Sequence, residues 1–294
     1  MTNRNIPIFI LAGGLGTRIS EETQMKAKPM VEIGGIPVLI HLMRYYCSFG
    51  FNDFVICGGY RVADIKNYFL NYRYNIHDLE IDTRASMKSS ITILSESSME
   101  ERWRVRILDT GVPTMTGGRV ARALDAIGPL QEFQDFGLTY GDGLCDANLC
   151  EEFKFHCEHG ATGTVLGVKN FARFGELDVV EGTKVNGFLE KPEFRQGFIN
   201  GGFFFFKKSF RNDLDTAETL VLERDPLQNL AKRGELRVFK HSGFWYAMDT
   251  LRDRNHLQTL WDSRQAPWTV KGGTEEGEGK VQNDNVRVLR RRIG

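Results

Sequence analysis

The sequence predicts an α/β fold, in which a mainly parallel sheet is covered by helices on both faces. An apolar run from Ile8 to Ala12 has the length and composition of a buried strand. Apolar residues then recur at helical spacing between residues 39 and 46, and a second buried run follows at residues 53–57. Because strand–helix–strand alternation is typical of parallel strands joined by crossover helices, these observations together predict the fold class.

Further elements follow along the chain. Val62, Ile65 and Phe69 mark a second amphipathic helix. The later pattern predicts helices over residues 119–127, 149–159 and around 257–261, and strands over 136–140, 162–168, 177–180, 185–190 and 199–206. The four consecutive phenylalanines at residues 203–206 indicate a buried strand rather than a binding surface.

One segment interrupts this alternation. Between residues 79 and 109 the pattern changes to three short β-like runs, LEIDT, SITIL and RVRIL, which we expect to form an inserted hairpin or edge region. After residue 268 the composition turns to Gly, Glu and Lys, which predicts a polar tail. We therefore expect one domain over residues 1–268, with an inserted β region at 79–109, and a tail over 269–294.

The composition excludes several classes of protein. The 294 residues include 41% hydrophobic and 26% charged residues, as in an ordinary globular protein. Lys and Arg together number 38, as do Asp and Glu, so no overall field favours nucleic acid or an anionic membrane. The first apolar run is too short for a signal peptide, and no stretch is long enough to span a bilayer. We therefore expect a cytoplasmic protein that binds neither nucleic acid nor a membrane.

The first predicted strand ends in a glycine-rich loop. Gly13, Gly14 and Gly16 leave backbone N–H groups uncovered at the carboxyl edge of the sheet, where open α/β sheets bind ligands. The loop does not complete G-x-G-x-x-G, because Ile19 replaces the third glycine, and no G-K-[ST] follows. It is therefore neither a dinucleotide fingerprint nor a P-loop, and a simple turn is the alternative interpretation.

Acidic and basic residues also lie where other predicted strands and helices begin or end. Asp142 lies between two glycines at a strand end, which fits either a turn or an Mg²⁺ ligand. Asp249 precedes a helix, where capping is the commoner role, and Thr250 with Asp253 resembles a capping pair. The cations beside glycine or proline breaks suit phosphate, and they are Arg18, Lys28, Arg119 and Lys191. The residues alone indicate a phosphate-handling protein that uses Mg²⁺.

An ordered series of motifs resembles the sugar-1-phosphate nucleotidyltransferases. It begins with LAGGLGTR, SEET, KAKPM and VEIGG, and continues with DTG, MTGGR, TYGDG, RFGELD, EKP, INGGFF, GFW and MDTLRD. The series covers residues 8–268, and SEET, MTGGR, GELRVF, GFW and MDTLRD are most similar to the glucose-1-phosphate cytidylyltransferase branch. The resemblance implies a Rossmann-like, mixed but mostly parallel sheet with a small inserted β region. It also implies cytidylyl transfer from CTP to glucose 1-phosphate, which yields CDP-glucose and pyrophosphate.

The resemblance implies a nucleotide site in the first half of the chain. In it, the loop from Gly16 to Arg18 would hold the β- and γ-phosphates, and Lys28 would neutralise charge near the α-phosphate. Thr114 and Arg119 would pack on the nucleotide and help to select cytosine. The matched nucleotide-binding positions are Leu11, Ala12, Gly13, Gly14, Gly16, Thr17, Arg18, Lys28, Thr114, Arg119 and Gly141.

The same resemblance implies a metal site and a sugar site. Asp142 and Asp249 would hold Mg²⁺, which offsets the repulsion between the two reacting phosphates. Lys191 would bind the phosphate of the sugar, in a pocket formed by Gly175, Glu190, Lys191 and Asn200. The catalytic residues would be Arg18, Lys28, Asp142 and Asp249.

Two positions depart from the family's pattern. Ala27 stands where a proline is usual, which predicts a less rigid loop without loss of charge. Glu176 stands where close relatives have a small residue, which predicts a carboxylate near the sugar pocket. A different phosphorylated acceptor therefore stays open, as does UTP or dTTP as the nucleotide.

Two other functions are weaker alternatives. A glycosyltransferase usually carries D-x-D at its metal site, whereas this chain has Asp142-Gly143-Leu144. A catalytically silent regulator that binds nucleotide sugars would be expected to lack a cation or a metal ligand of the site. In this chain every matched cation and metal ligand is present. The expected partners are therefore CTP and a sugar 1-phosphate, and we expect a homo-oligomer.

Overall fold

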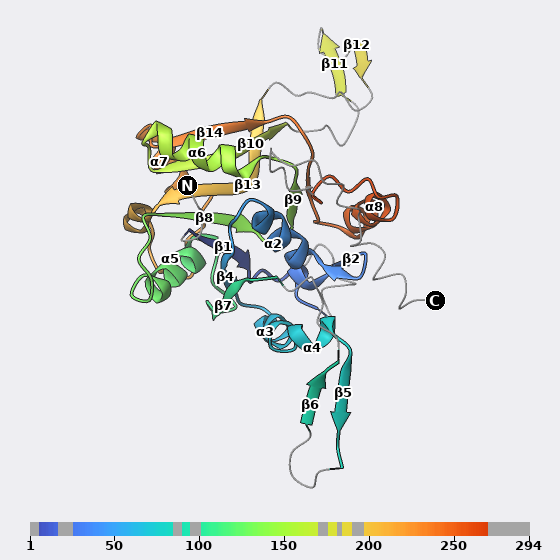
Figure 1. Cartoon of the computed structure of the whole chain (residues 1–294). Coiled ribbons are helices and arrows are strands. Elements are labelled where there is room, and N and C mark those ends of the chain that lie inside the picture. Colours follow the sequence, from blue (N-terminus) through green and yellow to red (C-terminus); the bar gives the residue numbers. More distant parts are fainter. Residues whose placement is uncertain are drawn as a thin grey trace, which may run out of the picture.

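A computed structural model of the chain describes residues 6–16, 26–84, 90–94, 101–169, 176–180, 184–189 and 197–269. Seven strands form a central sheet in the order β14-β10-β13-β8-β1-β4-β7 (Figure 1). Neighbouring strands are parallel except where β13 pairs with β10 and β8. The central strands are β1 (Pro7–Ala12), β4 (Asp53–Gly58), β7 (Arg104–Asp109), β8 (Asp135–Tyr140), β10 (Gly163–Lys169), β13 (Phe198–Lys207) and β14 (Leu236–His241).

Helices cover both faces of this sheet, as the sequence predicts. They are α2 (Val38–Ser48), α3 (Val62–Leu70), α4 (Tyr72–Ile76), α5 (Thr116–Ile127), α6 (Leu149–His159), α7 (Asp225–Lys232) and α8 (Leu251–Asp262), with 3-10 turns η2 (Lys28–Met30) and η3 (Lys208–Asp213). Alternate side chains of a strand point to opposite faces, so the sheet separates two cores. On β1, Ile8 and Ile10 join the core that contains α2. Phe9 and Leu11 join the other core, which contains residues of α5 and α7.

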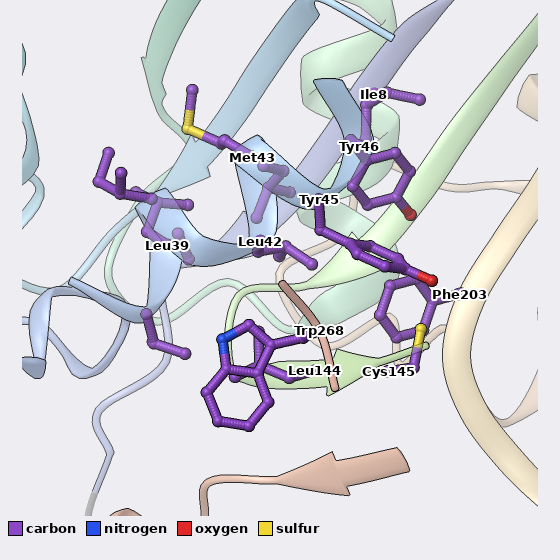
Figure 2. Packing of buried hydrophobic residues seen from close by; sticks show 14 of the residues in the cluster. Ile8, Leu39, Leu42, Met43, Tyr45, Tyr46, Leu144, Cys145, Phe203 and Trp268 are labelled. Atoms are coloured by element: carbon purple, nitrogen blue, oxygen red, sulfur yellow. The ribbon is translucent and has the colours of Figure 1, made fainter. Parts of the chain in front are cut away.

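The predicted phenylalanine strand is buried on both faces. Phe203 and Phe205 of β13 lie in the α2 core, and Phe204 and Phe206 lie in the α5 core, each at most 1% exposed. In the α2 core, Tyr45 and Tyr46 point toward the sheet near Phe203 (Figure 2). Trp268, which follows α8, packs beside Leu144 in the same cluster.

In the part of the chain that the structure describes, four short two-stranded pairs lie outside the central sheet. They are β2 (Glu32–Ile33) with β3 (Ile36–Pro37), β5 (Leu79–Asp82) with β6 (Ser90–Ile93), β9 (Gly143–Cys145) with β15 (Trp245–Ala247), and β11 (Glu176–Val180) with β12 (Lys184–Leu189). The β5–β6 hairpin projects beyond α4, away from the central sheet (Figure 1). None of the described helices is long and apolar enough to cross a membrane.

The segment expected as one inserted β region divides into two structures. Only β5 and β6 form a separate hairpin. The third run, RVRIL, is β7, which pairs in parallel with β4 as the edge strand of the central sheet. Its Val105 and Ile107 pack against the α2 core, and this burial explains why the run joins the sheet instead of extending the hairpin.

Candidate active site

A pocket of about 600 Å³ lies at the carboxyl edge of the sheet. This is the volume of a typical small-molecule site, and the place is where open α/β sheets bind ligands. The ends of β1 and β8 form part of its wall. The sequence-predicted site residues that line it are Leu11, Ala12, Gly13, Gly14, Gly16, Lys28, Thr114, Arg119, Gly141, Asp142, Asn200 and Asp249.

Hydrogen bonds from Arg119 anchor the glycine loop. The Arg119 guanidinium donates to the carbonyl oxygens of Gly13, Gly58 and Val112 at 2.9, 2.8 and 3.0 Å, and to Thr110 Oγ1 at 2.8 Å. A Cβ placed on Gly13 would lie 2.2 Å from this guanidinium, so the close approach requires glycine. The side chain predicted to pack on the nucleotide is therefore only 4% exposed, and these four hydrogen bonds join it to the protein.

Lys28 reaches the pocket from the short 3-10 turn η2. Pro29 occupies the first turn of η2, where its missing N–H costs nothing, and a Cβ on Gly141 would lie 3.1 Å from its ring. Ala27, just before the turn, is buried and donates its backbone N–H to Asp64 Oδ2 at 3.2 Å. A proline has no N–H to donate, so the departure at residue 27 gives this loop an anchor that proline would remove.

Asp142 and Asp249 lie side by side because two short strands pair. β9 follows Asp142, β15 precedes Asp249, and the two strands form an antiparallel ladder. The N–H of Met248 also donates to the Asp142 carbonyl at 2.9 Å. The N-cap of α8 is Thr250, whose capping box with Asp253 is present as predicted. Asp249 therefore does not cap α8, and its carboxylate faces Lys28 instead.

The Lys28 ammonium bridges the two carboxylates. Its Nζ lies 2.5 Å from Asp142 Oδ2 and 2.9 Å from Asp249 Oδ1. Burial alone would lower the pKa of Lys28, but the charges and hydrogen bonds of Asp142 and Asp249 outweigh it and hold the pKa above its usual value. The three groups thus form a compact centre with one positive and two negative charges, and their side chains are 15%, 23% and 28% exposed.

The donors of this centre fit a hard divalent cation that also binds the substrate. Among the described residues, no group of three or more His, Cys, Asp or Glu side chains could hold a metal without other ligands. Asp142 and Asp249 can offer two carboxylates, and phosphate and water oxygens would have to complete the coordination. Mg²⁺ is usually bound in this way, through one or two carboxylates together with substrate phosphates.

Several pocket residues were not predicted from the sequence. Met115, Thr116, Tyr140 and Trp245 line the cavity with the predicted residues. The Trp245 indole donates to the Gly201 carbonyl at 2.6 Å and so holds the β13 backbone beside Asn200. Each of the four lies within a matched motif, but side chains of these types are common in cores, so composition alone could not assign them to a site.

Lys26 is not among the residues that line the described pocket. Lys26, beside Lys28 in the sequence, pairs at 2.5 Å with Glu32 and is half exposed, as expected for a solvent-facing lysine. The remaining predicted site residues lie outside the described residues, and they are Thr17, Arg18, Gly175, Glu190 and Lys191.

Known proteins are similar to this chain over most of its length. A glucose-1-phosphate cytidylyltransferase of Salmonella typhi is 43% identical over 88% of this chain and 97% of the relative. A Bacillus subtilis protein assigned the same activity is 40% identical over 89% of this chain and 98% of the relative.

Solved structures share the fold. A Bacillus anthracis protein assigned as a glucose-1-phosphate thymidylyltransferase matches with a TM-score of 0.62 and 16% identity, over 92% of this chain and 98% of the other. HddC from Yersinia pseudotuberculosis matches with a TM-score of 0.59 and 22% identity, over 87% and 99%. The family model described as "Nucleotidyl transferase" matches residues 8–250. With this match and relatives of more than 40% identity along most of its length, the chain belongs to the nucleotidyl transferase family.

Proposed function

We propose that this enzyme transfers a cytidylyl group from CTP to glucose 1-phosphate and releases pyrophosphate. The similarity to glucose-1-phosphate cytidylyltransferases over nearly the whole chain supports the choice of substrates. The observation that carries the chemistry is the charged centre, in which Lys28 lies between Asp142 and Asp249 at the carboxyl edge of the sheet.

The reaction brings two anions together. A phosphate oxygen of glucose 1-phosphate attacks the α-phosphorus of CTP, a new P–O bond forms, and the bond from the α-phosphorus to the β-phosphate oxygen breaks. No side chain needs to become covalently attached, so the protein acts by positioning and by neutralising charge. The Lys28 ammonium is suited to donate to phosphate oxygens near the α-phosphorus, because its raised pKa keeps it protonated.

Asp142 and Asp249 would hold Mg²⁺, which supplies charge neutralisation between the two phosphates when bound. The backbone of Gly13 and Gly14 would lie along the nucleotide, with Arg119 fixing the Gly13 carbonyl. The roles inferred for Thr17, Arg18, Gly175, Glu190 and Lys191 are proposals from the sequence resemblance alone. Among them, Arg18 would stabilise the leaving pyrophosphate.

We also propose that the enzyme is a homo-oligomer that contacts its partner through the β5–β6 hairpin. Leu79 pairs with Ile93 and Ile81 with Ile91, so four apolar side chains share one face of the hairpin. Ile81 is 58% exposed and Ile91 46% exposed. An isolated two-stranded hairpin is marginally stable in water, so packing against a second copy would stabilise it. Light scattering should give a multiple of 33.5 kDa, and a smaller species for an Ile81→Lys, Ile91→Lys variant.

The division of the chain is a further proposal. Residues 1–268 would form one catalytic domain, because a single sheet carries both core faces and the family match covers residues 8–250. The β5–β6 hairpin would be an insertion in it, and residues 269–294 a polar tail. A variant that ends at residue 269 should keep its activity, and loss of activity would assign the tail a role in the domain.

A pyrophosphate-release screen tests the proposed function. Each of the four nucleoside triphosphates is combined with a panel of sugar 1-phosphates in the presence of Mg²⁺. CTP with glucose 1-phosphate should give the highest kcat/KM, and Asp142→Asn should abolish release. A preference for another nucleotide or acceptor would overturn the substrate assignment. Glu176→Ala, tested on the same panel, shows whether that position influences the choice of acceptor.

A further inference from the structure

Glu223 is a carboxylate that the proposed mechanism does not use. It lies in the turn at residues 222–224, directly before α7. Its Oε2 accepts a hydrogen bond from Thr116 Oγ1 at 2.8 Å, and its Oε1 accepts one from Tyr140 Oη. Thr116 and Tyr140 both line the pocket, whereas Glu223 lies behind them. One carboxylate therefore joins two walls of the pocket, one built on α5 and the other on β8.

On the α5 side, the segment before Glu223 packs tightly on the first turn of the helix. The N–H groups of Gly117 and Gly118 donate to the Leu220 carbonyl at 2.9 and 3.2 Å. The N–H of Leu222 donates to Thr116 Oγ1 at 2.9 Å. A Cβ on Gly117 would lie 2.8 Å from the Leu220 side chain, so glycine permits this approach. These N–H groups at the start of α5 therefore serve the protein, and the position of Thr116 depends on the segment that carries Glu223.

On the β8 side, Tyr140 is the residue before Gly141 and Asp142. Its ring packs over Gly202, where a Cβ would lie 2.4 Å from the ring. Its side chain also interacts with Asn200, a predicted sugar-pocket residue. Its hydroxyl donates to the Glu223 carboxylate from this position. Tyr140 thus connects Glu223 to the wall of the pocket at the end of β8.

We propose that Glu223 is a positioning residue for the nucleotide, which sets the separation between the Thr116 wall and the Tyr140 wall. Hydrogen bonds to a charged acceptor are stronger than those to a neutral one, so Glu223 holds both walls more firmly than an amide would. The proposal rests on the proposed function for the identity of the nucleotide. Because Glu223 acts behind the walls and touches no reacting atom, its loss should weaken nucleotide binding without slowing the chemical step.

Calorimetric binding of CTP with Mg²⁺, together with steady-state kinetics, tests this role. Glu223→Ala should weaken CTP binding about tenfold and raise the KM for CTP to a similar degree, because two charged hydrogen bonds are lost. The value of kcat should stay within about twofold, as expected when ground state and transition state lose the same interaction. Glu223→Gln keeps one acceptor oxygen and should recover part of the affinity.

Glu218→Ala is the matched control in the same segment. The Glu218 side chain is 54% exposed and pairs with Arg122 at 3.6 Å, while its backbone carbonyl, which accepts from Met115 N, is unchanged by the substitution. This variant should bind CTP like the unmodified enzyme. An equal loss in both variants would indicate a general loosening of the segment and would overturn the proposal.

Other outcomes are also decisive. Wild-type affinity in Glu223→Ala, or a fall in kcat at unchanged KM, would overturn the proposal. If Glu223→Ala does not fold, as judged by near-UV circular dichroism, Glu223→Gln carries the test, and unchanged binding in that variant would refute the role. If the enzyme binds a triphosphate other than CTP, the same comparison is made with that nucleotide. Failure to transfer to glucose 1-phosphate refutes the proposed function, whereas the binding comparison decides the role of Glu223 separately.

Discussion

Two cations in the pocket wall, Lys28 and Arg119, hold their charges in opposite surroundings. Lys28 lies between the carboxylates of Asp142 and Asp249, with its side chain 15% exposed. Arg119 is 4% exposed and donates to three carbonyl oxygens and one hydroxyl. Burial lowers the pKa of Arg119, whereas the two carboxylates overcome burial and raise the pKa of Lys28. A cation predicted for a site can therefore serve either the ligand or the fold.

The two cations differ in whether a ligand can replace the groups to which they bond. The partners of Lys28 are charged groups. A phosphate can take the place of the carboxylates beside the ammonium, and a metal ion can take the place of the ammonium beside the carboxylates, without leaving a charge unpaired. The partners of Arg119 are neutral groups of the backbone and of Thr110, and no ligand can take over four such bonds at once. We therefore expect Lys28 to control turnover and Arg119 to control the stability of the glycine loop.

Lys28→Met should give the largest effect. Loss of the ammonium removes charge stabilisation at the α-phosphate, so kcat should fall by about 100- to 1,000-fold. The free energy of unfolding should fall less than in Arg119→Met, because the two carboxylates that lose their cation are partly exposed to water, at 23% and 28%. Lys26→Met is the control, since Lys26 pairs with Glu32 outside the pocket and should keep normal turnover. A Lys28→Met enzyme with near-normal kcat would contradict this half of the comparison.

Arg119→Met should act on the fold instead. It removes four hydrogen bonds around the glycine loop, although the Gly13 and Gly58 carbonyls keep the N–H donors of Tyr60 and Thr110, so the free energy of unfolding should fall by about 3 kcal/mol. Urea denaturation measures the change, and Arg84→Met, at a side chain that is 85% exposed, should stay close to the unmodified protein. Arg119→Lys should not restore stability, because one ammonium cannot replace the planar set of donors. Unchanged stability in Arg119→Met would show that the glycine loop does not depend on this clamp.

Glu152 of α6 extends the comparison to a buried acid that has no hydrogen-bond partner among the described residues. It is fully buried, and neither of its carboxyl oxygens has a hydrogen-bond partner among the described residues. Burial raises the pKa of the Glu152 carboxyl to about 8, so near neutral pH the folded protein keeps it protonated. In the unfolded chain the same group loses its proton near its ordinary pKa of 4.5.

The sign of the pH dependence follows from this difference. Between about pH 5 and pH 8 the folded state holds one proton more than the unfolded state at Glu152, so the free energy of unfolding should fall as pH rises. The slope from this group is at most about 1.4 kcal/mol per pH unit. Glu152→Gln should remove that slope in urea denaturation at pH 5.5 and 7.5. Glu151→Gln, on the exposed side of the same helix, should keep it, and an unchanged slope in Glu152→Gln would refute the assignment.

The smallest expected effect concerns metal binding without nucleotide. While the Lys28 ammonium bonds to Asp142 and Asp249, it competes with any divalent cation for the same oxygens. Lys28→Met should therefore bind Mn²⁺ in the absence of CTP about tenfold more tightly than the unmodified protein, which corresponds to the loss of one charged hydrogen bond. Titration calorimetry or the EPR signal of free Mn²⁺ measures this. Equal or weaker Mn²⁺ binding would show that the ammonium does not compete with the metal ion for the carboxylates.

Much of the fold could be predicted because burial and periodicity are local signals. The continuous apolar run at β1, the phenylalanines of β13 and the apolar face of α2 each show their environment in the sequence. β14 was not predicted, because as an edge strand it carries polar residues such as Arg237 and Lys240 between its apolar ones. β7 was grouped with β5 and β6 as an inserted hairpin or edge region, because a short β-like run does not show which strand it pairs with, and the structure places it at the edge of the central sheet.

The residues of the site could be named from motifs, but not the way they interact. The pairing of β9 with β15, which brings Asp142 and Asp249 together, joins positions more than 100 residues apart and has no local signal. Capping was the commoner role for Asp249, and the structure gives that role to Thr250. The role of Arg119 as a clamp depends on carbonyl groups from the glycine loop, the end of β4 and the loop after β7, which no sequence pattern records.

A single-turnover experiment tests the central claim most directly. CTP labelled at the α-phosphorus is mixed with excess enzyme, Mg²⁺ and glucose 1-phosphate, and the products are separated at short times. We predict that the label appears in CDP-glucose, with one pyrophosphate released for each label transferred, and that Lys28→Met forms this product at least about 100-fold more slowly. Label recovered only as CMP, or transfer by Lys28→Met at the normal rate, would contradict the account.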